Sequence, residues 1–299
     1  MTINCISIDL DRYPLTHYEK HQLNTLLARL DYRVTLENKR ILMDEAWHKY
    51  GCSQEVADES YGKFYSDPIW LLTGIFNEQH PESCNHRKAI ASVVKSLDPE
   101  VVVDYGGGCG ALARKIAESC PNSKVYICEP HPFRLAVELS KSFPKLSYID
   151  SLSEVNCDVL VSTDVLEHVH DPLAVLSHMI SALNIGGHII IANCFYPVIA
   201  CHLPSTFHFR YSFDKFCNEL GLELLGPCEG SHAYIYRRAK LVEPDWARLR
   251  VLERRSKKLF LWRQWDASYL KPWRYRLRRL IQHPMYYPRR LAHKIGLRP

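Results

Sequence analysis

Seven strand-like runs alternate with helix-length segments between residues 101 and 238, and no other feature constrains the fold as strongly. The runs read VVVD, VYICE, LSYID, DVLVS, HIIIAN, LELL and AYIYR. Apolar strands separated by helical segments predict a mainly parallel sheet with helices on both faces. Only GPCEGSH separates the last two runs, so we expect them to pair as an antiparallel hairpin at the sheet edge. The predicted fold class is α/β, a doubly wound, seven-stranded, mainly parallel sheet.

A glycine turn follows the first run. Residues 101–111 read VVVDYGGGCGA, and apolar residues recur at helical spacing in the LARKIAES that follows. Glycine tolerates positive φ and leaves no Cβ between the backbone and a ligand at the helix N-terminus. Ligands of such sheets bind beyond the carboxyl ends of the strands, so we expect a nucleotide cofactor at this turn.

Two cofactor patterns fit the turn. A dinucleotide fingerprint, G-x-G-x-x-G/A, begins at Gly106, and a second pattern, D-x-G-x-G-x-G, runs from Asp104 to Gly110. On the second pattern, and on STDVLEHVHDP at residues 162–172, the chain from about residue 87 to about residue 238 resembles the class I S-adenosylmethionine-dependent methyltransferases. An NAD-type Rossmann oxidoreductase is the alternative, and a non-catalytic binding protein with a vestigial cofactor site is another.

The resemblance implies where the cofactor lies. The glycine turn would surround its methionine part, Glu129 would bind the ribose hydroxyls, and Asp150 would meet the adenine amino group. One carboxylate can accept hydrogen bonds from both hydroxyls of a ribose, which agrees with the role of Glu129. The alternative for Asp150 is an exposed acid at the end of a strand without a ligand, and the alternative for Arg87 is an exposed arginine on a helix surface. The residues that we predict to bind the cofactor are Asp104, Gly106, Gly108, Gly110, Glu129, Asp150, Ser151, Asp164 and Arg87.

The segment after the fourth strand also limits the acceptor. It reads Ser162-Thr163-Asp164 where exocyclic-amine nucleic acid methyltransferases show Asp/Asn-Pro-Pro-Tyr/Phe, and no cysteine stands in the motif of the cytosine C5 enzymes. We therefore expect a small molecule or a glycan as the acceptor, methylated at oxygen, and not a nucleic acid. The helix that follows should end at Gly186 and Gly187, because glycine commonly ends helices.

Two histidines are candidates for a general base, since imidazole titrates near neutral pH. His168 belongs to the DVLEHV segment, and His208 belongs to an aromatic loop at residues 195–213. The alternative for His168 is packing against the cofactor or a bond to a backbone carbonyl.

The same loop should bind the acceptor, because long loops at the ligand end of a sheet are usually functional. Aromatic side chains with a few polar groups suit a sugar ring or a planar molecule. The alternative is that FHFRYSF, residues 207–213, forms an ordinary strand with a solvated arginine. The residues that we expect to contact the acceptor are His202, Arg210 and Tyr211.

Composition excludes several other classes. The 11 cysteines are odd in number and never form C-x-x-C, so we expect neither a disulfide framework nor a metal site. No apolar run approaches the length of a membrane span, and the N-terminus lacks the order of a signal peptide. We therefore expect a soluble, cytoplasmic protein.

Three segments organise the chain. Residues 1–95 carry helical patterns and form a predicted N-terminal cover, residues 96–239 form the cofactor domain, and residues 240–299 form a helical extension. Aromatic residues of the cover are expected either to close over the cofactor as a lid or to form a satellite core. These aromatic residues are Tyr61, Phe64, Tyr65 and Trp70.

The extension differs sharply in charge from the rest of the chain. Residues 240–299 hold 17 Lys and Arg against 4 Asp and Glu, whereas residues 1–239 hold 21 against 29. Tryptophan and tyrosine are interleaved with these charges, and WRYRLRRLI at residues 273–281 has helical spacing. Basic faces with such aromatics suit an anionic membrane surface. Docking onto the acidic remainder or a second subunit is the alternative, with nucleic acid as a lesser one.

Overall fold

The computed structural model describes residues 5–270 and residue 273. Its centre is a seven-stranded sheet in the order β3-β2-β1-β4-β5-β7-β6. Strands β1 to β5 are parallel, and β7 runs antiparallel to both β5 and β6. The predicted fold class and edge hairpin are thus confirmed. The strands are β1 (Val101–Tyr105), β2 (Lys124–Cys128), β3 (Leu146–Ile149), β4 (Cys157–Thr163), β5 (Leu183–Ala192), β6 (Leu222–Pro227) and β7 (Tyr234–Arg238).

Two helical layers cover the sheet, because successive strand side chains point to opposite faces. In β1, Val102 packs in the core beneath α5 and α6, and Val103 packs in the core beneath α8 and α9. Both valines are fully buried, as a parallel strand covered on both faces requires. The helices of this domain are α5 (Pro81–Leu97), α6 (Ala111–Ser119), α7 (Arg134–Ser140), α8 (Pro172–Ala182) and α9 (Phe213–Glu219), with short 3₁₀ turns η2 (Leu152–Glu154), η3 (Leu166–His168) and η4 (Pro204–Tyr211).

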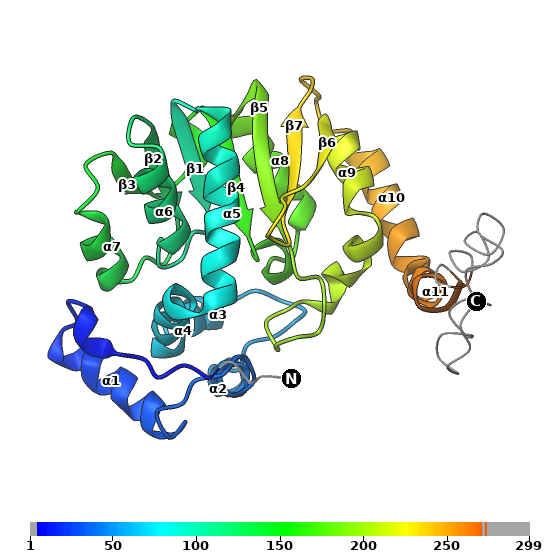
Figure 1. Ribbon diagram of the computed structural model, residues 1–299. Coiled ribbons are helices and arrows are strands. Elements are labelled where there is room, and N and C mark those ends of the chain that lie inside the picture. The colour runs from blue at the N-terminus through cyan, green and yellow to red at the C-terminus, as the bar shows by residue number, and fades with distance from the viewer. Residues whose placement is uncertain (1–4, 271–272, 274–299) are drawn as a thin grey trace, which may run out of the picture.

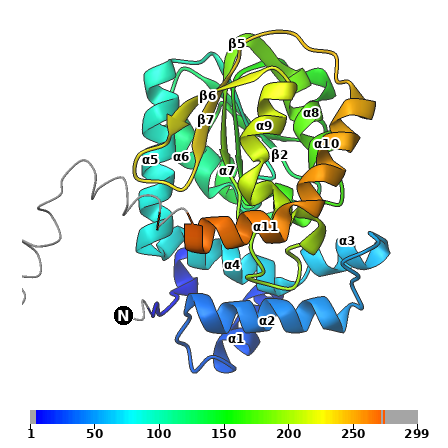
Figure 2. The same cartoon turned by 90° about the vertical axis from the view of Figure 1, so that its right-hand side faces the viewer.

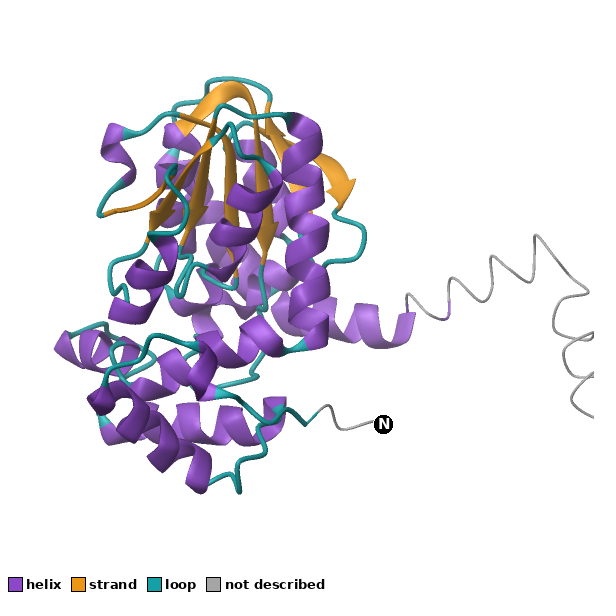
Figure 3. Ribbon diagram, turned by 60° about the vertical axis from the view of Figure 1, so that its left-hand side comes forward, coloured by secondary structure: helices purple, strands orange, loops and turns teal. Residues whose placement is uncertain are grey.

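The N-terminal helices gather at the carboxyl ends of the parallel strands, below the sheet in Figure 1 and again in Figure 3. They enclose a core of their own that includes Leu23, Trp47, Phe64 and Phe76. The aromatic region expected to be a cover forms two helices, and Pro68 occupies the first turn of the second. These elements are η1 (Leu10–Arg12), α1 (His17–Ala28), α2 (Leu36–Lys49), α3 (Glu59–Tyr65) and α4 (Pro68–Gln79).

The C-terminal extension begins with a helix that docks on the predicted cofactor domain. Helix α10 (Trp246–Lys258) lies beside α9 in Figure 2, and its Leu249 is buried in the sheet core. Arg250 of this helix forms an ion pair with Asp171, which lies within the acidic residues 1–239. Docking onto the domain therefore accounts for α10.

The remainder of the extension is more exposed. Helix α11 (Phe260–Trp265) buries none of its residues, and a short π-helical turn, η5 (Asp266–Leu270), follows it. Apart from Trp273, the predicted helix at residues 273–281 lies outside the described residues. No helix within the described part of the chain is long and apolar enough to cross a membrane.

Candidate active site

A cavity of about 1240 Å³ opens at the carboxyl ends of the strands, between the glycine turn and helices α2 to α5. Pockets for one small ligand usually measure about 300–1000 Å³. The volume therefore suits a cofactor together with a second small molecule.

The glycine turn forms one wall of the cavity. Gly106, Gly108 and Gly110 have φ values of +70°, +52° and +70°, a region that residues with a Cβ rarely adopt. A Cβ on Gly106 would lie 2.5 Å from Cγ2 of Val165, whereas a Cβ on Gly108 would meet nothing within 4 Å. Gly106 is thus required for packing against the DVLEHV segment, and Gly108 leaves open space along the wall. Gly110 caps α6 outside the cavity lining.

Glu129 follows β2 and binds this turn directly. One of its carboxylate oxygens accepts a hydrogen bond from the N–H of Gly108 at 3.0 Å, and the other accepts one from the N–H of His131 at 3.0 Å. A carboxylate offers about four acceptor positions, so two remain for a ligand's hydroxyls. Asp150 also lines the cavity, whereas Ser151 accepts a bond from the N–H of Ser153 and does not line it.

Asp104 lies beneath the turn and does not line the cavity. It is 1% exposed, and a Cβ on Gly107 would lie 2.7 Å from its carboxylate. Burial raises the pKa of Asp104 to about 7. Neither carboxylate oxygen of Asp104 has a hydrogen-bond partner in the described part of the chain, so its contact with the cofactor stays a prediction.

Asp164 and Arg87 both line the cavity. Asp164 adopts φ +55° directly after β4, and its carboxylate lies 3.2 Å from Nε2 of His232. Arg87 donates hydrogen bonds to the carbonyls of Asn77 and Glu78 at the end of α4. The Arg87 guanidinium thus already serves a helix C-terminus, where carbonyl groups lack partners.

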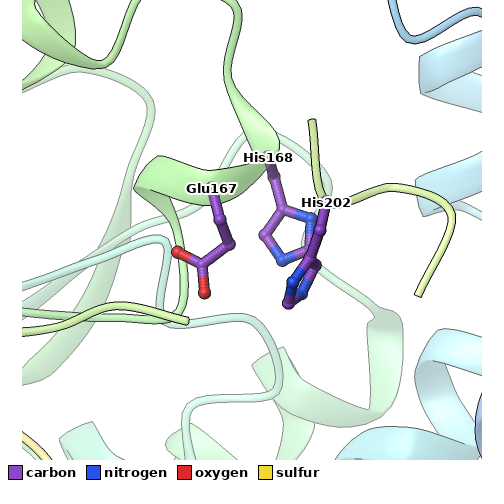
Figure 4. A group of neighbouring side chains, drawn as sticks. All are labelled: Glu167, His168 and His202. Atoms are coloured by element: carbon purple, nitrogen blue, oxygen red, sulfur yellow. The ribbon is translucent and has the colours of Figure 1, made fainter. Parts of the chain in front are cut away.

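A cluster of three polar side chains, Glu167, His168 and His202, lies where η3 meets the loop after β5 (Figure 4). The rings of His168 and His202 are 4.8 Å apart, and both line the cavity. Burial lowers the pKa of His168 to about 3 and also lowers that of His202. The neighbouring Glu167 is fully buried, and burial together with the charge of Asp164 raises its pKa.

Three of the residues predicted for catalysis or acceptor binding do not line the cavity: His208, Arg210 and Tyr211. The ring of His208 packs against Phe209 and Phe216 and is 3% exposed. Arg210 donates to the carbonyl of Phe195 and covers the ring of Tyr196 at 3.5 Å. The structure therefore corrects the expected catalytic role of His208 and acceptor contacts of Arg210 and Tyr211, because η4 turns these side chains into packing contacts.

The N-terminal aromatics divide between the two expected roles. Phe64 belongs to the satellite core, whereas Tyr61, Tyr65 and Trp70 line the cavity as a lid would. Tyr65, Trp70 and Asn193 each carry a buried polar atom with no hydrogen-bond partner within residues 5–270. Unpaired buried polar atoms are costly, so this lining fits a bound ligand that would satisfy them.

Lys39 and Glu167 are among the side chains of the site that the sequence does not single out. Lys39 of α2 lines the cavity, and burial lowers its pKa to about 8. Glu167 was seen only as part of a motif. No local pattern predicts that either side chain is buried. Lys39, for example, stands in the helical sequence LENKRILM, where a lysine would be expected on the exposed face.

Comparison with known proteins places the chain in a family. The family model described as "Methyltransferase domain" matches residues 76–298, more than half of the chain. The chain belongs to this methyltransferase family. Its cofactor is S-adenosylmethionine, and its sheet is the Rossmann-like sheet of class I. Neither the NAD-type oxidoreductase nor the vestigial binding protein is favoured.

Individual relatives of this methyltransferase are distant. The ubiquinone biosynthesis O-methyltransferase of Vibrio cholerae is 27% identical over 132 residues, which are 42% of this chain and 54% of that protein. The chain thus spans about half the length of the curated relatives that it matches. Among solved structures, human N-acetylserotonin methyltransferase has a TM-score of 0.48 at 14% identity, covering 73% of this chain and 70% of that chain. A putative O-methyltransferase from Nostoc punctiforme has a TM-score of 0.46 at 18% identity, covering 67% and 68%.

Proposed function

We propose that this methyltransferase transfers a methyl group from S-adenosylmethionine to a hydroxyl oxygen of a small molecule or glycan. One observation carries the proposal: the glycine turn with Glu129 and the histidine cluster line the same cavity, whose volume of about 1240 Å³ exceeds that of a single-ligand pocket. The curated relatives that the chain matches are ubiquinone biosynthesis O-methyltransferases, which supports oxygen as the methylated atom.

Different residues of the cavity bind and surround the cofactor. Bound S-adenosylmethionine supplies an electrophilic methyl group on sulfur. Gly106 and Gly108 let the backbone approach it, and Glu129 offers acceptor positions for its ribose hydroxyls. Tyr65 and Trp70 line the cavity from the N-terminal helices, where they would shield a bound ligand from part of the solvent.

His168 is positioned to orient the acceptor. Its Nδ1–H donates to the carbonyl of Cys201 at 3.2 Å, which leaves Nε2 as an acceptor for a hydroxyl hydrogen. A pKa of about 3 is far below the value near 7 that suits a general base. Orientation of the hydroxyl is therefore the main role that we assign to His168.

An acceptor screen tests this function. The protein would be incubated with S-adenosylmethionine and a panel of phenols, catechols, nucleotide sugars and lipid-linked glycans, and S-adenosylhomocysteine release would be followed. We expect release with one class, an O-methylated product, and much slower release with Glu129→Ala. A product methylated at nitrogen or carbon would contradict the assignment to oxygen.

We further propose that the exposed end of the extension contacts an anionic membrane surface, and that the enzyme is cytoplasmic. Leu261, Trp262 and Tyr269 are 76%, 56% and 66% exposed, and Lys258 and Arg263 lie beside them in the chain. Exposed aromatic and aliphatic groups flanked by cations suit the interface of an anionic bilayer.

A further inference from the structure

Three potential metal ligands meet at the edge of the cavity, where His168 and His202 line it and Glu167 lies buried beside them. Glu167 and His168 come from the short turn η3, and His202 comes from the loop after β5. One donor atom from each residue lies within 4.8 Å of the other two. Figure 4 shows the carboxylate and the two rings projecting to the same side of η3.

Both imidazoles are held in the tautomer that a metal ion requires. Nδ1 of His168 lies 3.2 Å from the carbonyl of Cys201, and Nδ1 of His202 lies 2.7 Å from the carbonyl of Tyr196. A carbonyl only accepts, so each Nδ1 carries the hydrogen and each Nε2 keeps a lone pair. Metal-binding histidines are oriented by this kind of outer hydrogen bond.

Glu167 supplies an unsatisfied buried oxygen. Its side chain is 0% exposed, and Oε1 accepts a hydrogen bond from the N–H of Cys194 at 2.7 Å. Oε2 has no hydrogen-bond partner among the described residues. A buried carboxylate oxygen without a partner is costly, and a bound cation would remove that cost.

We propose that Glu167, His168 and His202 bind one divalent transition-metal ion such as Zn²⁺ or Mn²⁺. Two imidazoles and one carboxylate suit such ions and leave coordination positions open. Ligand bonds of about 2.0–2.2 Å require the three donors to draw closer than 4.8 Å on binding. Both histidines line the cavity, so the open positions face it.

The role of this ion rests on the proposed function. An acceptor hydroxyl that reaches an open position would be fixed in place, and the ion's charge would lower the pKa of that hydroxyl. With the ion bound, Nε2 of His168 holds the ion instead of accepting the hydroxyl hydrogen, so His168 orients the acceptor through the ion. The hydroxyl's proton leaves to solvent as its oxygen takes the methyl group.

Metal titrations without cofactor or acceptor test the site. Zn²⁺, Mn²⁺ and Co²⁺ would each be titrated into the full chain by calorimetry, with visible absorption as a second readout for Co²⁺. Glu167→Gln keeps an oxygen for the N–H of Cys194 but removes the charge. His202→Asn keeps a donor for the Tyr196 carbonyl but removes Nε2. His131→Ala is the matched control, because His131 lines the same cavity outside the cluster.

We expect one ion per chain in the wild type and in His131→Ala. In Glu167→Gln and in His202→Asn, the affinity for the ion should be at least about 100-fold weaker. The 11 cysteines are present in all four proteins, so binding at thiols would appear equally in each. Equal affinity in all four proteins, or no ion bound by the folded wild type, would overturn the site. If one variant fails to fold, the other decides. Intact metal binding without methyl transfer would instead contradict the proposed function alone.

Discussion

Glu129 and Gly108 are joined by a hydrogen bond of 3.0 Å, in which the backbone N–H of the glycine donates to the carboxylate. The acid that ends β2 therefore fixes the glycine turn that follows β1. Both residues line the cavity, so a ligand bound to Glu129 lies close to the turn that this bond holds. Changes at the turn should accordingly affect cofactor binding as well as stability.

Gly108→Ala should separate these two effects. With φ at +52°, the variant should lose about 1 kcal/mol of stability, and the added methyl group should lower S-adenosylmethionine affinity at least about tenfold by filling cavity space. Gly51→Ala is the control, since Gly51 has φ +66° and open space but does not line the cavity. Calorimetry and urea unfolding would measure both quantities. Unchanged cofactor affinity in Gly108→Ala would count against the placement of the cofactor at the turn.

Asp104 should make the stability of the cofactor-free protein depend on pH. Its pKa is about 7 when folded and near the ordinary 3.8 when unfolded, so the folded state binds the extra proton between these values. Its contribution is fully present below pH 4 and is lost as pH rises through 7, at about 1.4 kcal/mol per pH unit. Asp104→Asn should remove this fall, which urea unfolding across pH 4–8 would show.

The control for that experiment is Asp150→Asn, because Asp150 is exposed. This variant should keep the pH dependence of the wild type. If Asp104→Asn and the wild type show the same slope between pH 4 and 7, Asp104 does not carry a raised pKa.

His168 and His208 should respond differently to the same substitution. His168→Gln removes Nε2 from the cavity and should lower turnover by about 100-fold, because the acceptor loses its orientation, with cofactor affinity near normal. His208→Gln should leave turnover near wild type and cost about 1–3 kcal/mol of stability, because the ring packs against Phe209 and Phe216. Single-turnover rates with an acceptor from the screen would check both. A large loss of turnover with a stable His208→Gln would restore His208 as a catalytic candidate.

The exposed end of the extension should bind anionic vesicles. Binding should increase with the fraction of anionic lipid and decrease with salt, since each nearby Lys or Arg adds about 1 kcal/mol. Trp262→Ala combined with Trp265→Ala should abolish it, because these side chains are 56% and 49% exposed. Trp246→Ala is the control, as Trp246 covers Arg250 on the docked helix α10. Sedimentation that depends on neither lipid charge nor salt would refute membrane contact.

Most of the sheet could be predicted because its strands are continuous runs of valine, isoleucine and leucine. The end of α8 could not: Gly186 and Gly187 were expected to end it, but it ends at Ala182 and both glycines lie in β5. A Cβ on Gly187 would lie 2.8 Å from the carbonyl oxygen of Asp158 in β4. Gly187 is therefore required by the close approach of β4 and β5, a tertiary contact that the local sequence does not show.

The loop at residues 195–213 was harder to predict for a similar reason. Its FHFRYSF segment alternates like a strand, yet His208 and Phe209 are adjacent and both buried. A 3₁₀ turn allows this because neighbouring side chains need not point to opposite faces, as they must in a strand.

At the site, the cofactor side was easier to predict than the acceptor side. Glu129 and the glycines are fixed by their places at strand ends, which the sequence pattern reveals. The chemistry of Glu167 depends on burial beside Cys194 and His202, which the fold brings from another segment. Such contacts follow from tertiary structure and leave no local signature.

The most direct test of the central claim is a calorimetric titration of the wild type and of Glu129→Ala with S-adenosylmethionine, and of the wild type with NAD. We predict that the wild type binds one S-adenosylmethionine per chain, more tightly than NAD. In Glu129→Ala, the loss of charge-assisted hydrogen bonds should weaken S-adenosylmethionine binding by about 1.5–3 kcal/mol. Tighter binding of NAD, or unchanged S-adenosylmethionine affinity in Glu129→Ala, would contradict the assignment of the cofactor and its site.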